Sequence, residues 1–110
     1  MVFFRRRRPE KVVSISKEIG EFDPTVPGYY RNVESAIFEV RRKVPVSVKV
    51  TSDAPVDVSV LSGTGEPVDF IQQVTEYSYG PKNPPANGMM AVVVAVLTGD
   101  RANIELTVEA

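Results

Sequence analysis

The chain of 110 residues contains neither cysteine nor histidine. Without cysteine it can form no disulfide framework and no thiolate metal site. Without histidine it lacks the commonest general base and the commonest metal ligand. We therefore expect no enzyme activity, no cofactor and no metal.

Long apolar runs are also missing, because no stretch of eighteen apolar residues occurs that could span a membrane. The start does not resemble a signal peptide, since Val2, Phe3 and Phe4 form too short an apolar segment and precede the positive charges. We expect a cytoplasmic or virion location without a signal peptide, unless a leader has been removed.

Charge is distributed unevenly along the chain. The net charge is −1, but Arg5, Arg6, Arg7 and Arg8 concentrate four of the thirteen basic residues at the start. Residues 9–110 hold the other nine basic residues and all fourteen acidic ones, a formal charge of −5. A nucleic-acid-binding domain usually carries a basic face on its body. Here the body is acidic and would repel phosphate, so any binding to nucleic acid must come from the arginines alone. We therefore divide the chain into a basic arm, 1–9, and one domain, 10–110.

The arm has two interpretations. Its arginines could neutralise three or four phosphates of a nucleic acid, or attach to an anionic membrane. Phe3 and Phe4 could insert into a membrane or dock on a neighbouring subunit. The alternative is a solvated chain terminus without a partner.

Period-two alternation of apolar and polar residues dominates the remaining sequence. It is clearest from Val44 to Val50, where valine occupies every second position. The turn residues 52–55 then predict a β-hairpin over 44–61. Residues 89–97 are apolar at nearly every position, as in a central strand covered on both faces. The predicted strands are 11–17, 36–41, 44–50, 56–60, 68–79, 89–97 and 104–108.

These patterns predict an all-β protein, an antiparallel β-sandwich of about seven strands with jelly-roll or Ig-like topology and no substantial helix. If successive strands run up and down, loops 20–33, 52–55 and 80–88 share one end. Turns 42–45, 62–67 and 98–102 share the other. The first end would hold a contact surface for protein or glycan, because tyrosine gives large contact area at small entropic cost. Its candidates are Tyr29, Tyr30, Arg31, Tyr77, Tyr79, Asn83 and Asn87. In the alternative interpretation, some of these tyrosines belong to the core.

Catalytic motifs are weak. Ser14-Ile15-Ser16-Lys17 has the Ser-x-x-Lys spacing of penicillin-recognising enzymes, but it lies in a predicted strand and lacks companion motifs. Gly63-Thr64-Gly65 lacks the further glycine, lysine and helix of a phosphate-binding loop. We interpret the first as the solvated face of a strand and the second as a turn.

Residues 38–61, with the sequence FEVRRKVPVSVKVTSDAPVDVSVL, together with residues 91–108, resemble GOLD-type and pre-peptidase C-terminal-type β-sandwich modules. Those modules share a strand, a turn of small, acidic and proline residues before Val-Asp-Val, and a closing hairpin. The resemblance implies a non-catalytic binding or packing module and assigns no site residue.

We therefore expect a non-enzymatic protein that acts through protein–protein contacts, as a small subunit of a larger assembly. A minor, cementing or decorating protein of a virion shell is the sharpest form of this hypothesis. The arm would tether it to a neighbour or a polyanion. The alternative is a monomeric binding module that uses the tyrosine-rich end for a ligand or the arm for an anionic membrane.

Overall fold

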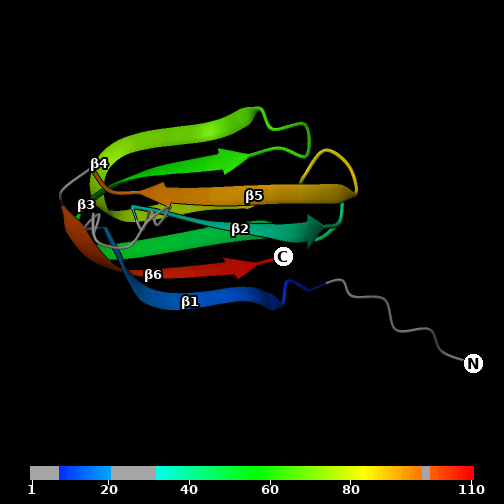
Figure 1. The fold of residues 1–110 in the computed structure, drawn as a ribbon. Coiled ribbons are helices and arrows are strands. Elements are labelled where there is room, and N and C mark those ends of the chain that lie inside the picture. Colours follow the sequence, from blue (N-terminus) through cyan, green and yellow to red (C-terminus); the bar gives the residue numbers. More distant parts are fainter. Residues whose placement is uncertain (1–7, 21–31, 98–99) are drawn as a thin grey trace, which may run out of the picture.

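A computed structural model describes residues 8–20, 32–97 and 100–110 (Figure 1). In this part of the chain all regular structure is β, without a helix, and every strand pairing is antiparallel. This confirms the all-β prediction. The six strands are β1 (Lys11–Gly20), β2 (Val33–Val40), β3 (Val46–Leu61), β4 (Pro67–Lys82), β5 (Gly88–Ala95) and β6 (Arg101–Glu109).

The sheet has the strand order β1-β6-β3-β5-β2, and β4 pairs with the other edge of β3. Residues 47–52 of β3 pair with β6, whereas residues 57–61 pair with β5. The sheet therefore has two halves, which we name here. The first half-sheet contains β1, β6, the start of β3 and the end of β4. The second half-sheet contains β2, β5, the end of β3 and the start of β4.

The sheet is nearly closed, because its two outermost strands approach each other. Lys17 on β1 forms an ion pair with Glu34 on β2, with 2.7 Å between Nζ and Oε2. Both side chains retain exposure to solvent, so this pair contributes little to stability. It does mark where β1 and β2 meet.

The core lies between the two half-sheets. The period-two pattern places the valines of β3, at positions 46–50 and 56–60, on its inner face. They pack with Phe38, Val92, Ile104 and Leu106 from the neighbouring strands. No polar or charged residue is fully buried among the described residues, apart from the phenol of Tyr77. A core of this kind depends on apolar burial alone.

The predicted hairpin over 44–61 is wrong. Its two halves do not pair with each other but belong to different half-sheets, and β3 is one continuous strand that curls over at one end (Figure 1). At the bend the Ser52 hydroxyl donates to the Ala54 carbonyl, and Asp53 accepts two hydrogen bonds from Asn103 of β6. The turn-forming residues thus carry the strand across the core, which lets both sets of valines face inward.

β4 bends in the same way, and this changes which loops share an end of the fold. At the bend Gln73 has a φ of 56°, and its N–H donates to Asp57 Oδ1 at 2.9 Å. Because β4 returns on itself, loop 83–87 lies beside turns 41–45 and 62–66 rather than beside the bend of β3. Asn87 accepts a hydrogen bond from the N–H of Arg42. The predicted grouping of loop 80–88 with loop 52–55 is therefore wrong.

Candidate functional site

The outward-facing side of the first half-sheet is polar. Its side chains come from alternate positions of the four strands, and the registers place them on one face. They are Ser14, Ser16, Glu18, Ser47, Lys49, Thr51, Glu76, Ser78, Asn103, Glu105, Thr107 and Glu109. Such a surface is normal for a sheet with one solvated face.

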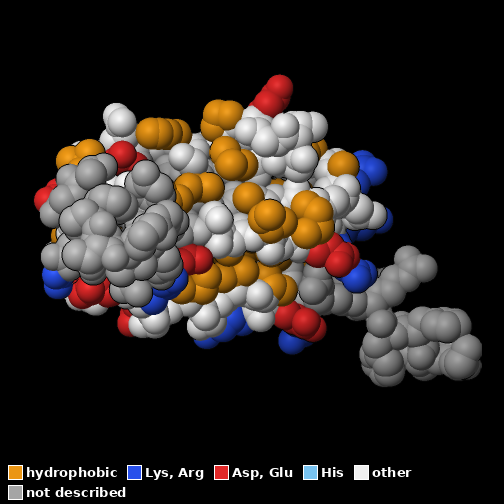
Figure 2. All heavy atoms as spheres, viewed as in Figure 1, with side chains coloured by type: hydrophobic (Ala, Val, Ile, Leu, Met, Phe, Trp, Pro, Cys, Tyr) orange, Lys and Arg blue, Asp and Glu red, His pale blue; other side chains and the backbone are white. Residues whose placement is uncertain are grey.

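The outward-facing side of the second half-sheet is apolar. The registers again place alternate positions together. We call this surface the apolar face; it consists of Val33, Ile37, Leu61, Val68, Phe70, Met89, Ala91, Val93, Ala95 and Leu97, with Ser35 and Ser59 on either side of Val93. Ile37 is 71% exposed and Phe70 is 50% exposed. Figure 2 shows hydrophobic side chains gathered over β2 and β5 on this side.

The cross-strand register joins the apolar side chains of β2, β5 and β3 at the level of Ala91, whereas serines flank Val93. Ile37 lies opposite Ala91, which lies opposite Leu61 on the far side of β5. Charged side chains on this face are confined to its margins, at Glu39 and Asp57. The sequence predicts β5 as a strand covered on both faces, but the described chain covers only its inner face. The outward-facing sides of the two half-sheets therefore differ, because the first is polar and the second is mainly apolar.

A pocket of about 370 Å³ opens at the end of the fold between turn 62–66 and loop 83–87, beside Val40 at the end of β2. We call it the end pocket. Its floor includes the buried side chains of Val40 and Met90. Val68 and Met89 line it and also belong to the apolar face, so the two surfaces are continuous. Its volume is typical of sites that bind small molecules or side chains.

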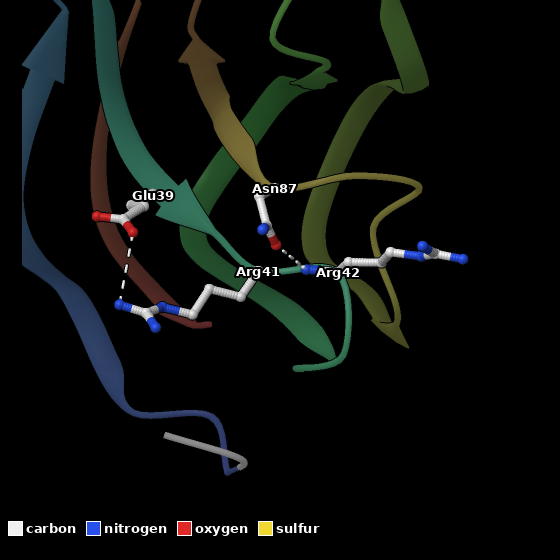
Figure 3. Close-up of polar contacts among 4 residues, drawn as sticks. All are labelled: Glu39, Arg41, Arg42 and Asn87. Atoms are coloured by element: carbon white, nitrogen blue, oxygen red, sulfur yellow. Dashed lines mark hydrogen bonds and ion pairs between the residues drawn. The ribbon is translucent and has the colours of Figure 1, made fainter. Parts of the chain in front are cut away.

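The lining of the end pocket carries one cation and no acid. Lys82 lines it, with Nζ 5.1 Å from the centre of the Tyr79 ring, while no Asp or Glu lines it. The Asn87 side chain, also in the lining, holds the backbone of Arg42 at 2.8 Å. Figure 3 shows that the Arg42 side chain extends away from Arg41, whose guanidinium lies 3.7 Å from Glu39. Among the described residues, neither Arg42 nor Lys82 has a carboxylate partner.

The structure brings together only part of the predicted contact surface. Tyr79, Asn83 and Asn87 all line the end pocket. Tyr77 does not join them: it is 7% exposed in the core, so its assignment to a contact surface is wrong. Its hydroxyl donates to Asp69 Oδ2 at 2.6 Å and so links the two halves of the bent β4. Burial, and then this hydrogen bond, raise the pKa of Tyr77 above its ordinary value.

The remaining candidates lie mostly outside the described residues. This holds for Tyr29, Tyr30 and Arg31, and for the arm residues Phe3, Phe4, Arg5, Arg6 and Arg7. Arg8 is described and is exposed to solvent.

The described residues offer little for catalysis. Ser14 and Lys17 occupy strand positions of opposite parity, so they face opposite sides of β1 and cannot form a Ser–Lys pair. A shallow polar hollow of about 580 Å³ lies near the bend of β3, lined in part by Lys17, Glu18 and Glu105. Within the described ranges no cluster of acidic side chains could hold a metal ion, and no helix could span a membrane.

Comparison with known proteins adds no relative. No protein-family model matches the chain, and no curated protein matches it. The resemblance to GOLD-type and pre-peptidase C-terminal-type modules therefore stays a prediction.

Sequence reasoning missed the apolar face as a site. Its signal is present in the segment 89–97, where both faces of the strand are apolar. That pattern indicates a strand covered on both faces, and the structure shows that the described residues cover only the inner face of β5.

Proposed function

We propose that this protein is a non-enzymatic structural subunit that acts through protein–protein contacts, repeated in a larger assembly. The observation that carries the proposal is the contrast between the polar outer side of the first half-sheet and the apolar face of the second. Soluble monomers seldom leave a continuous apolar sheet face open to water, whereas subunits of assemblies bury such faces.

The proposed partner at the apolar face is a second copy of this chain. Six large apolar side chains of the face are between 47% and 71% exposed, namely Val33, Ile37, Val68, Phe70, Met89 and Leu97. A second copy would cover them in a contact of the usual size, about 800 Å² per partner. Its centre, around Ala91 and Val93, is uncharged, so two identical faces can meet without like-charge repulsion. Two sheets packed in this way lie about 10 Å apart and interdigitate their side chains.

The proposal also gives roles to the two half-sheets and to the arm. The two half-sheets would act as the layers of a jelly-roll or Ig-like sandwich. The arginines of the arm would tether the subunit to a neighbour or to a polyanion inside the shell. A minor, cementing or decorating virion protein combines these features.

Sedimentation velocity of the full chain over a wide concentration range tests the proposal. We expect a species larger than the monomer, and its fraction should rise with protein concentration. Deletion of residues 1–8 should leave the face-to-face contact intact and weaken only binding to polyanions such as heparin. A strict monomer at millimolar concentration would contradict self-assembly through the apolar face.

A further inference from the structure

The end pocket combines an apolar interior with the cationic side chain of Lys82 in its lining. Its floor is formed by the buried Val40 and Met90, and Tyr79 forms a half-buried wall. The volume of about 370 Å³ can accommodate one large side chain with part of the attached backbone. An aromatic side chain gains most from such a site, because it buries the largest apolar area.

The charges beside the pocket determine which groups can flank the inserted side chain. Lys82 lines the pocket, and the backbone N–H of Arg42 donates to Asn87 in the lining, which contains no acid. The ammonium of Lys82 over the Tyr79 ring and the guanidinium of Arg42 both lack a carboxylate partner among the residues that the structure places. Two unpaired cations beside an apolar pocket are complementary to an apolar group flanked by negative charge.

The chain's own arm does not meet this requirement. β1 starts at the same end as the pocket, since Lys11 is in register with Glu109 and Glu109 with Ser47. Phe3 and Phe4 are aromatic, but they precede four adjacent arginines, and a cationic segment of this kind is repelled by Arg42 and Lys82.

Continuity with the apolar face favours a protein segment over a free small molecule. Val68 and Met89 belong to both surfaces, so a protein that covers the apolar face also lies against the mouth of the pocket. This step rests on the proposed assembly role. We infer that the end pocket binds an acidic peptide segment of a partner subunit, with an aromatic side chain inserted and flanking carboxylates on Lys82 and Arg42.

The test uses a fluorescent peptide with the sequence Gly-Glu-Phe-Asp-Pro, which occurs at positions 20–24 of this chain. We expect saturable binding to the full chain with a Kd below about 1 mM. Replacing phenylalanine in the peptide by alanine should weaken binding at least about tenfold, because the buried aromatic area is lost. A neutral Gly-Gln-Phe-Asn-Pro peptide should also bind more weakly, and the difference should shrink at high salt.

Protein variants locate the site. Lys82→Glu should weaken binding about fivefold or more, since one attraction becomes a repulsion. Lys49→Glu makes the same change of charge on the polar outer side of the first half-sheet and should have no effect. Ala86→Trp in the exposed loop 83–87 should fill the pocket and abolish binding without disturbing the core.

Three results would overturn the inference: no saturable binding, equal loss with Lys49→Glu, or binding that is unaffected by Ala86→Trp. Binding of decanoate that Ala86→Trp abolishes, while the peptide fails to bind, would assign the site to a small amphipathic carboxylate instead. An Ile37→Glu variant separates this inference from the proposed function. If it is monomeric and still binds the peptide, the pocket stands without the face; if assemblies form and no peptide binds, only the pocket inference fails.

Discussion

Ile37→Glu is the substitution that most sharply probes the apolar face. Ile37 is 71% exposed and lies opposite Ala91 in the middle of the face. Covering an isoleucine side chain stabilises a contact by about 2 kcal/mol, and a two-fold contact contains the residue twice. The loss of about 4 kcal/mol corresponds to roughly a thousandfold in Kd, and burying the introduced carboxylate adds to it.

The stability of the folded monomer should change little on this substitution. Ile37 contributes little to the core. We therefore expect the free energy of unfolding of the variant to change by no more than about 1 kcal/mol. Ser78→Glu is the matched control, because it adds the same charge opposite Lys49 on the polar side. Sedimentation velocity measures association, and calorimetry measures stability. Unchanged association of Ile37→Glu, or equal loss with Ser78→Glu, would refute the reasoning.

Further predictions concern the bends and their ionisable groups. The pKa of Tyr77 is raised by burial and by Asp69, so this phenol ionises at lower pH in the unfolded chain than in the folded one. The free energy of unfolding should therefore fall as pH rises above about 10. Tyr77→Phe should lower the free energy of unfolding by about 1 kcal/mol and remove this pH dependence. The pKa of Asp53 is lowered by the hydrogen bonds from Asn103, so its contribution should be lost as pH falls below the ordinary value of 3.8; in an NMR titration, Asn103→Ala should return the pKa toward that value. Gly80 has a φ of 81° and a Cβ there would collide with a carbonyl of β3, so Gly80→Ala should destabilise by at least about 2 kcal/mol in urea unfolding, and a smaller loss would contradict the close approach.

Local patterning predicted the strands well. The valines of residues 46–50 and 56–60 do face the core, and the segments 36–40 and 104–108 are strands as their alternation indicates. These elements follow from the side-chain period of a strand, which depends only on neighbouring residues.

Connectivity was harder to predict, because it depends on pairing between distant segments. Ser52–Pro55 contains good turn residues, but nothing local distinguishes a turn within one sheet from a bend between two half-sheets. The bend of β4 at Gln73 has even less signal, since a left-handed backbone at glutamine is unusual. Once that bend is missed, loop 83–87 is assigned to the wrong end of the fold.

The candidate site shows the same division. Tyr79, Asn83 and Asn87 could be grouped from the sequence because they are close along the chain. Their association with Arg42 depends on the two bends and could not be predicted. The apolar face requires the cross-strand register of β2, β5, β3 and β4, which only the structure supplies.

The central claim is that the apolar face is covered in the working state of the protein, and thiol reactivity tests it most directly. The chain has no cysteine, so Val93→Cys places a single thiol at the centre of the face, and Ser78→Cys places one on the polar side. Alkylation rates are measured from dilute to concentrated protein. The assembly model predicts that Cys at position 93 becomes protected as concentration rises while Cys at position 78 stays reactive. Equal reactivity of both thiols at every concentration would contradict it.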